Sequence, residues 1–339
     1  MHARLLSLIV AFLVAGCLSS TPPEEDNNEA PPVDIESPPL PSNLAWRQLA
    51  SASLPRAEHC AANIGSKFYV LGGFVLPNPV SAPGAAGNVP TGPPVNAVEI
   101  YDAATNSWSV GPAYPTVLEH CLATSVGDTI YVFYSVIGIE EPASYKLKAG
   151  TTSWVAIASP PNNHNSGMAC VMDGLIYTAG SAPTVDIYDP ATDKWTTKEA
   201  TIPTDRGHTS GGCANGKLYV TAGDIGGHSQ NTDATEEFDP VKDNWTVKAP
   251  VPVKRGSIQA VSWLGRIVVM GGQDGSTNVP AYPDVNAYDP VTDTWTDLPK
   301  MTGRHGFAAV VFEDKIYVFA GAPQQGVSAF SETHVLEAQ

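Results

Sequence analysis

Short apolar segments bounded by turn-forming residues recur along most of the chain. Residues 217–222 (KLYVTA) and 315–320 (KIYVFA) each follow a turn, and each ends where small residues begin. The turn before the first segment contains Asn215 and Gly216, a pair that tolerates the positive φ angles of a tight hairpin. Segments of this length, rich in Val, Ile and Tyr and closed by such turns, predict antiparallel β-strands and disfavour long helices.

Three marks repeat in a constant order after these segments: a pair of small residues, a Tyr-Asp or Phe-Asp turn, and a Trp. The small pairs lie at 72–73, 180–181, 223–224, 271–272 and 321–322, the turns at 101–102, 188–190, 238–240 and 288–290, and the tryptophans at 108, 154, 195, 245 and 295. Degenerate copies lie at 134–135 and 145–146. A period of about 50 residues is typical of propeller blades, and the marks define six units.

Each unit contains four short predicted strands, and one such sheet cannot bury both of its faces alone. The chain therefore predicts an all-β, six-bladed propeller over residues 44–339. The last unit has no Trp strand after residues 333–336, whereas Trp46 stands alone before the first unit. We expect residues 44–50 to complete the sixth blade, which removes an exposed sheet edge.

The glycine pairs, the Tyr-Asp-Pro-x-Thr-Asp-x-Trp segments and the Arg-Gly-His element at 206–208 resemble kelch repeats over about residues 45–337. The resemblance implies a kelch-type propeller. Propellers of this family include a seven-bladed copper oxidase and a six-bladed periplasmic sialic-acid epimerase, so the fold is compatible with both binding and catalysis.

One face of the predicted propeller carries the connections that precede the first strand and follow the second strand of each unit. Those at 73–95, 224–235 and 273–284 are long and irregular, as binding loops on a rigid scaffold often are. The first strands begin at the mouth of the central channel on this face. Basic residues gather there: Arg56, Arg206, Arg255, Arg304, His59, His120, His164, His208 and His305.

Two interpretations of these basic residues stay open. A ring of guanidinium and imidazole groups would bind carboxylates or phosphates, as in a sugar acid or an acidic peptide. Alternatively, the same side chains bond to acids or carbonyls of the blades and serve the fold alone. Glu58 and Glu119 each precede a His at this rim, but no catalytic motif is present, and catalytic residues stay unassigned.

The histidines belong to different units and surround a wide mouth, and the chain contains neither HExxH nor paired CxxC spacing. Metal sites need three or four ligands that converge at close range. We therefore predict no metal and no cofactor.

Four of the five cysteines occupy matching positions in the first strands of neighbouring units: Cys60 and Cys121, then Cys170 and Cys213. Disulfides within these two pairs are one arrangement that fits the spacing. Four small buried thiols are the other.

The N-terminus predicts export. Residues 1–16 hold Arg4 and an apolar stretch that is too short to span a bilayer. They end in Leu-Val-Ala-Gly before Cys17, which resembles a prokaryotic lipoprotein signal and implies acylation of Cys17. Residues 17–43, rich in Pro and acidic residues, predict a disordered linker. We expect an extracytoplasmic protein anchored to a membrane, at the cell surface or in the periplasm.

The balance of acidic and basic residues disfavours some classes of binding partner. With 18 basic and 34 acidic residues and a net charge of -16, the chain disfavours nucleic acid and anionic lipid surfaces. The leading hypothesis is a monomeric binding or scaffold module that takes a protein or glycan partner on the channel-mouth face. The alternative is an exported carbohydrate-active enzyme, similar to a sialic-acid epimerase or mutarotase, that uses the Arg/His ring. A metal-dependent oxidase is a third hypothesis.

Overall fold

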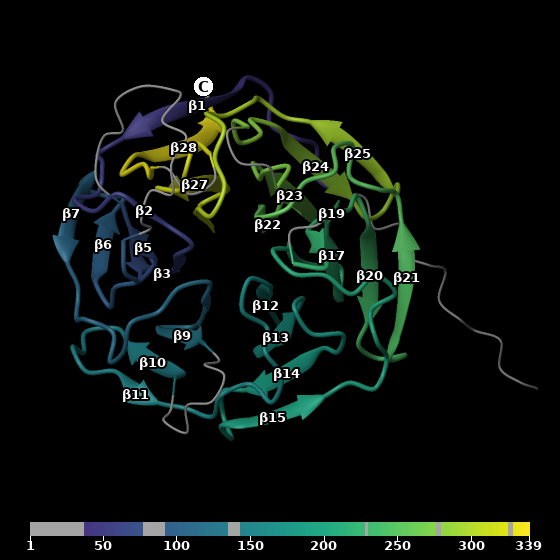
Figure 1. The fold of residues 1–339 in the computed structure, drawn as a ribbon, viewed down its shortest axis with the longest axis horizontal. Helices are drawn as coiled ribbons and strands as arrows, with labels where there is room; N and C mark the ends of the chain where they lie inside the picture. Colours follow the sequence, from purple (N-terminus) through teal and green to yellow (C-terminus); the bar gives the residue numbers. More distant parts are fainter. Residues whose placement is uncertain (1–36, 77–91, 135–142, 228–229, 276–278, 325–327) are drawn as a thin grey trace, which may run out of the picture. The chain divides into compact units, whose positions relative to one another are not determined.

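The structure is a computed structural model that describes residues 37–76, 92–134, 143–227, 230–275, 279–324 and 328–339. These residues form six four-stranded antiparallel sheets around a central axis (Figure 1). The predicted all-β, six-bladed propeller is therefore confirmed. None of the described segments forms a helix long and apolar enough to cross a bilayer.

Each blade runs from an innermost strand a to an outermost strand d. The strands a to d are, in blade 1, β3 (Cys60–Ile64), β4 (Lys67–Leu71), β6 (Val98–Asp102) and β7 (Ser107–Val110); in blade 2, β8 (Leu122–Val126), β9 (Thr129–Phe133), β10 (Tyr145–Lys148) and β11 (Val155–Ala156); in blade 3, β12 (Met168–Met172), β13 (Leu175–Ala179), β14 (Asp186–Asp189) and β15 (Lys194–Thr197); in blade 4, β16 (Ser210–Ala214), β17 (Lys217–Thr221), β20 (Thr235–Asp239) and β21 (Asn244–Lys248); in blade 5, β22 (Gln259–Trp263), β23 (Arg266–Met270), β24 (Val285–Asp289) and β25 (Thr294–Asp297); and in blade 6, β26 (Ala308–Phe312), β27 (Lys315–Phe319), β28 (Thr333–Ala338) and β1 (Leu44–Leu49). Two further two-stranded sheets pair β2 (Arg56–Ala57) with β5 (Phe74–Val75) and β18 (Asp224–Ile225) with β19 (Gln230–Asn231).

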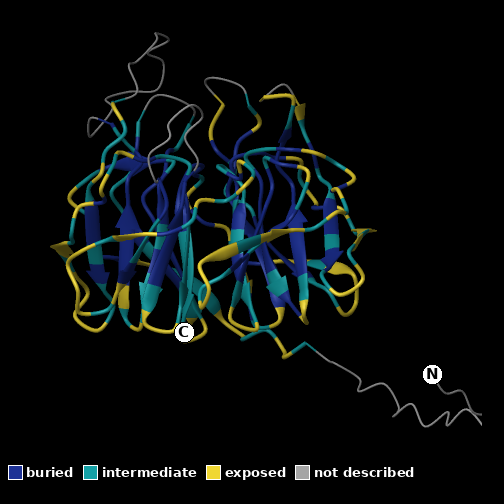
Figure 2. Cartoon of the chain, turned by 90° about the horizontal axis from the view of Figure 1, so that it is seen from below, coloured by how far each residue is buried: buried dark blue, intermediate teal, exposed yellow. Residues whose placement is uncertain are grey.

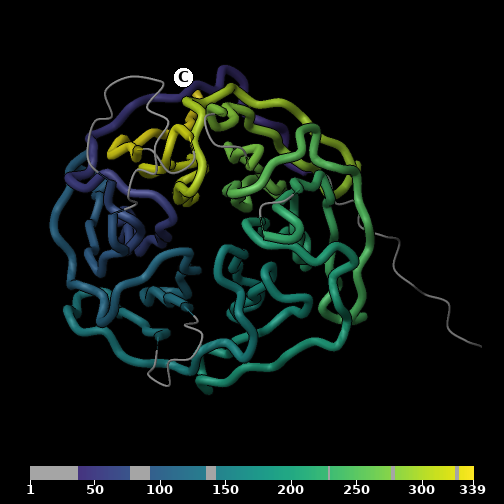
Figure 3. The backbone as a smooth tube through the Cα atoms, in the orientation of Figure 1, coloured from purple at the N-terminus to yellow at the C-terminus, as the bar shows by residue number. Residues whose placement is uncertain are grey.

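The first described strand closes the ring by pairing with the last one. β1 runs antiparallel to β28, with Trp46 opposite Leu336, as expected from the sequence. In Figure 3 the purple start of the described chain lies beside its yellow end. Since β28 is strand c of blade 6, the ends of the chain together complete one sheet and leave no gap between the first and last blades.

The recurring Trp joins each blade to its predecessor. In blades 1, 3, 4 and 5 the centroid of its indole lies about 5 Å from that of the Tyr or Phe of strand c, for example Trp295 against Tyr288. The indole N–H donates to a backbone carbonyl that follows strand d of the preceding blade, as from Trp295 to Ala249 at 2.9 Å and from Trp46 to Pro299 at 2.8 Å. A Trp can bury a large apolar area and still satisfy its one donor, which explains why this residue recurs.

The chain enters the propeller on the face opposite the channel mouth. The Ser37 hydroxyl donates to the carboxylate of Asp289 at 2.8 Å, and Arg266 donates to the carbonyl of Pro38 at 2.6 Å. Both partners lie at hairpin turns of blade 5. Figure 2 shows the C-terminus at this same edge of the propeller, and most of the buried strand residues lie toward the opposite edge.

These contacts begin at Ser37, so part of the segment predicted as linker packs on the propeller ahead of residue 44. The predicted signal peptide, Cys17 and the linker up to residue 36 lie outside the described residues.

Removing residues 1–50 takes β1 out of blade 6 and leaves β28 as an unpaired edge, which favours aggregation. We expect this variant to lose the cooperative thermal unfolding of the full chain, as followed by circular dichroism. A chain that lacks only residues 1–36 keeps all the described contacts and serves as the control, with an unchanged midpoint. An unchanged midpoint after removal of residues 1–50 would contradict the role of β1 as the closing strand.

Candidate functional site at the channel mouth

A ring of backbone hydrogen bonds surrounds the channel mouth. Just before strand a, each blade places one residue in the left-handed region, with φ between 43° and 60°: Glu58, His120, Ser166, His208, Ser257 and Gly306. N–H groups at this turn donate to the turn of the preceding blade: Glu58 to Gly306, His120 to Glu58, Ser166 to His120, Thr209 to Ser166, Ser257 to His208 and Gly306 to Ser257, at 2.6–3.4 Å. Each blade is thus bonded to its neighbour directly at the mouth.

A cavity of about 580 Å³ opens at the mouth, against blades 1 to 4. A throat of about 40 Å³ adjoins it at the level of the ring, and the two share His120, Ser166 and His208 in their walls. The larger cavity is lined by Phe74, Glu119, His120, Asn163, Asn165, Ser166, Ser181, Asp205, Arg206, Gly207, His208, Asp224, Gly226 and Gly227.

Glu58 links three blades through its carboxylate. One oxygen lies 3.3 Å from Nε2 of His120, and the other lies 3.5 Å from Nδ1 of His305. The second nitrogen of His120 pairs with Glu119. Burial raises the pKa of Glu58, but the charges and hydrogen bonds of the imidazoles outweigh it and hold this pKa far below its ordinary value.

His208 continues this network toward the cavity. Its ring meets that of His120 edge to face, with centroids 5.3 Å apart. Its Nδ1 lies 3.1 Å from a carboxylate oxygen of Asp224. Burial lowers the pKa of His208, but the hydrogen bond to Asp224 and the charge of Glu58 outweigh it, so the net shift is upward. The site therefore alternates acids and imidazoles around the mouth.

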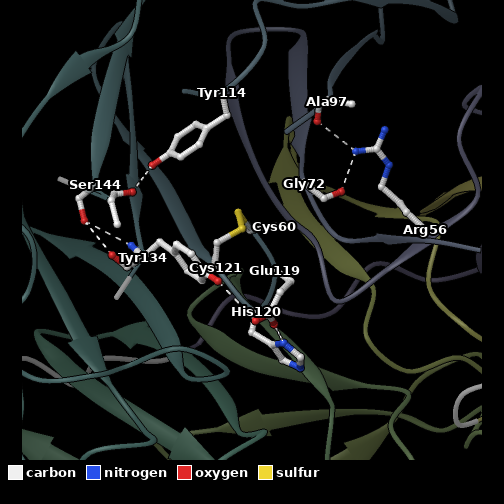
Figure 4. The surroundings of a disulfide bond; sticks show 11 residues. Arg56, Cys60, Gly72, Ala97, Tyr114, Glu119, His120, Cys121, Tyr134 and Ser144 are labelled. Atoms are coloured by element: carbon white, nitrogen blue, oxygen red, sulfur yellow. Dashed lines mark hydrogen bonds and ion pairs between the residues drawn. A yellow bond between two sulfur atoms is a disulfide. The ribbon is translucent and has the colours of Figure 1, made fainter. Parts of the chain in front are cut away.

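The four arginines require a correction to the predicted guanidinium ring. All four are at most 3% exposed: Arg56, Arg206, Arg255 and Arg304. Arg206 contributes to the cavity wall, but none of the four presents an exposed guanidinium group to an anion at the channel mouth. Their guanidinium groups turn into their own blades and donate to carbonyls there, as Arg56 does to Gly72 at 2.9 Å and to Ala97 at 3.3 Å (Figure 4). Of the two interpretations left open, the structure contains the one in which the arginines serve the fold.

Each arginine also binds one or two polar side chains near or on strand c of its own blade. Arg56 pairs with Glu99, Arg206 with Glu236, Arg255 with Asn286 at 2.7 Å, and Arg304 with His334 at 3.3 Å and Glu332 at 3.6 Å. Burial lowers the pKa of Arg255 and of Arg304 to about 10. These guanidinium groups are desolvated and held by structural partners, which are carboxylates for Arg56, Arg206 and Arg304 and a neutral amide for Arg255.

Blades 2 and 3 show that the position held by arginine in the other four blades has a structural role. In blade 3 it holds His164, which is 1% exposed and bonds the Asp186 carboxylate at 2.9 Å. In blade 2 it holds Leu118, and strand c offers Tyr145 where the other blades offer a polar partner. Leu118 and Tyr145 belong to one hydrophobic cluster. When one member of the pair becomes apolar, so does the other.

The predicted histidines separate into two groups. His120 and His208 line the cavity. His59 lies in the wall of the throat and is 4% exposed, while His305 is 5% exposed and reaches the site through Glu58. The sequence analysis did not single out Asp205 and Asp224, which also line the cavity. Asp205 directly precedes Arg206 in the sequence, and Asp224 lies near His208 across a hairpin. This proximity to a basic residue was the signal that the sequence offered.

The cysteines connect neighbouring blades in pairs. Cys60 is joined to Cys121 and Cys170 to Cys213, with Cα atoms 5.5 and 5.8 Å apart. The structure thus contains the bridged arrangement rather than four free thiols. Figure 4 shows Cys60 and Cys121 near Glu119 and His120, so the first bridge ties blades 1 and 2 beside the mouth. Among the described residues, no group of three or more His, Cys, Asp or Glu side chains could hold a metal ion.

Arg206→Leu leaves the carboxylate of Glu236, which is 1% exposed, without its counter-charge. We expect this variant to lose about 3–5 kcal/mol of the free energy of unfolding, measured with urea. The double variant Arg206→Leu/Glu236→Tyr copies the apolar pair of blade 2 and should lose less.

The matched control is Arg47→Leu, which breaks an ion pair with Glu337 whose arginine is 53% exposed. It should change the free energy of unfolding by less than about 1 kcal/mol. If Arg206→Leu cost no more than this control, the buried pair would not be the constraint described above.

Comparison with known proteins agrees with the repeat pattern. The family model described as Kelch motif matches residues 55–113, 205–252 and 254–302. Kelch-like protein terF of Aspergillus terreus is 27% identical over 320 residues, which cover 86% of this chain and 67% of that protein. Beta-scruin of Limulus polyphemus is 32% identical over 185 residues, covering 48% of this chain and 19% of that protein.

The chain spans about two thirds of the first of these relatives and about a fifth of the second. Among solved structures, the one titled Structure of YjhT matches with a TM-score of 0.66 and 15% identity, over 86% of this chain and 97% of that chain. That likeness concerns the fold alone. Repeats, sheet topology and sequence relatives agree, and together they support a kelch-repeat family for this chain.

Proposed function

We propose that this propeller is an extracytoplasmic, lipid-anchored binding module that takes its partner at the channel-mouth face. The observation that carries the proposal is the cavity of about 580 Å³, whose wall combines residues of four blades and of two long connections. The rigid blades hold these side chains in place, which lowers the entropy cost of recognition. A kelch propeller fold is consistent with such a protein-binding scaffold.

The entry point of the chain supports an anchored arrangement. Ser37 and Pro38 contact the hairpin turns of blade 5, on the face opposite the cavity. A tether that runs from an acylated Cys17 to Ser37 would therefore leave the channel mouth free for a partner. The alternative enzyme for acidic sugars depended on a ring of exposed guanidinium groups, and the structure instead pairs those groups with side chains of their own blades.

Cys17→Ser removes the proposed acylation site without touching any described contact. We expect the wild-type chain to sediment with membranes and to partition into the detergent phase of Triton X-114, and the variant to do neither. Release of the wild-type chain by high salt alone would contradict a lipid anchor.

Partner binding at the mouth can be tested by photo-cross-linking in cells that carry the gene. Asn163, exposed at the cavity rim, is replaced by p-benzoylphenylalanine, and Asp173, exposed at a hairpin turn of the opposite face, is replaced in the control. We expect a discrete cross-linked product at Asn163 and none at Asp173. Equal products at both positions, or a product at Asp173 alone, would place the partner elsewhere.

A further inference from the structure

We propose that Asn244 is an acceptor for N-linked glycosylation and receives an oligosaccharide from a lipid carrier outside the cytoplasm. The segment Asn244-Trp245-Thr246 is the one place in the sequence that reads Asn-x-Ser/Thr with a residue other than proline in the middle. The inference rests on the proposed export of the chain. It adds a modification site that is independent of the channel mouth.

The repeat places its own structural polar residue one position before this asparagine. In four blades the residue directly before strand d accepts a hydrogen bond from a backbone N–H of the preceding blade, at 2.8–3.2 Å: Asn106, Asp193, Asp243 and Asp293. In blade 4, Asp243 accepts from the N–H of Ala200, and Trp245 donates to the carbonyl of the same Ala200 at 3.3 Å. Asp243 and Trp245 thus hold the preceding blade, and Asn244 lies between them.

The fold does not require an asparagine at position 244. The equivalent residues are Ser107 in blade 1, Lys194 in blade 3 and Thr294 in blade 5, each the first residue of its strand d. Within the described part of the chain, the side chain of Asn244 forms no hydrogen bond. Its amide is therefore available for a reaction that leaves the contacts of the blade intact.

The geometry of strand β21 presents both reading points of the motif to solvent. Successive side chains of a strand point to opposite sides, so Asn244 and Thr246 share one side and Trp245 lies on the other. Trp245 packs there against Phe238, with centroids 5.1 Å apart. Asn244 and Thr246 are both exposed, and Val241 in the adjoining turn is 91% exposed. A transferase that reads the amide and the hydroxyl together would find both on one accessible side.

The reaction joins the side-chain amide to a sugar. The donor class is an oligosaccharide linked through its C1 to a polyprenyl phosphate or pyrophosphate. A bond forms between Nδ2 of Asn244 and this C1, while the bond between C1 and the phosphate oxygen breaks. The lipid phosphate leaves with the electron pair, and the amide nitrogen gives up one proton. The product is a bulky, hydrophilic group at the surface, with no oxidation or reduction.

The modified residue would lie away from the proposed partner site. β20 ends at Asp239 and β21 begins at Asn244, so Asn244 follows a hairpin turn of blade 4 between strands c and d. The equivalent turn of blade 5 begins at Asp289, which Ser37 contacts on the face opposite the channel mouth. A glycan on Asn244 would therefore leave the mouth open, and Asn244→Gln should not change the cross-link at Asn163.

The test uses the full chain, recovered from the membrane fraction of the organism that carries the gene. Trypsin releases residues 243–248 as one peptide, and mass spectrometry reads its glycan directly. We expect this peptide to carry a glycan in most copies, and the intact chain to migrate more slowly on a gel than the variant Asn244→Gln. Thr246→Val removes the hydroxyl and should abolish the modification as well, whereas Thr246→Ser keeps the hydroxyl and should retain it.

The matched control is Thr296→Val, which removes the threonine at the same position of strand d in blade 5 and should leave the migration unchanged. An unmodified peptide 243–248 from chains already processed at Cys17 would overturn the glycosylation and leave the proposed export intact. A slow migration that persists in Asn244→Gln would overturn it as well. A chain found in the cytoplasm with residues 1–16 still attached would overturn both proposals together.

Discussion

The ring of backbone hydrogen bonds at the channel mouth is the constraint on which the site depends. Both the N–H and the C=O of each turn reach sideways, to the preceding and the following blade, and this requires a left-handed residue in every blade. Five of the six are not glycine, although each such residue costs roughly 1–2 kcal/mol. The ring compensates for that strain, and in return it brings together side chains from blades that are far apart in the sequence, such as Glu58, His120 and His305.

The fold was predictable because each recurring sequence feature meets a requirement of its own hairpin or blade. Tight hairpins need residues that accept positive φ, as at Asn215 and Gly216, and blades need a large apolar residue with one donor, as at Trp295. These needs repeat in every blade, so they leave a periodic trace in the sequence. Ring closure through Trp46 followed from the one unit that lacked its own strand d.

The site was less predictable because its members meet only after the ring has closed. Position alone could not tell whether Arg56 faces solvent or its own blade, since both orientations begin from the same turn. One signal was available within the sequence. Arg206 occurs with Glu236 and His164 with Asp186, whereas Leu118 occurs with Tyr145. In these three blades the two positions change character together, because a lone buried charge is so costly.

The candidate site lies where the repeat is broken rather than where it is regular. Gly306 is the one glycine of the left-handed ring, and the carboxylate of Glu58 occupies the space that a Cβ of residue 306 would need. A side chain at position 306 would push this carboxylate away from His120 and His305, its partners in the network. The side chains that recur in the repeat, including all four arginines, make contacts within the fold. The groups that can contact a ligand are therefore acids and imidazoles that differ between blades. The mouth therefore combines carboxylates and imidazoles from several blades, although the repeat itself supplies a buried cation to four of its six blades.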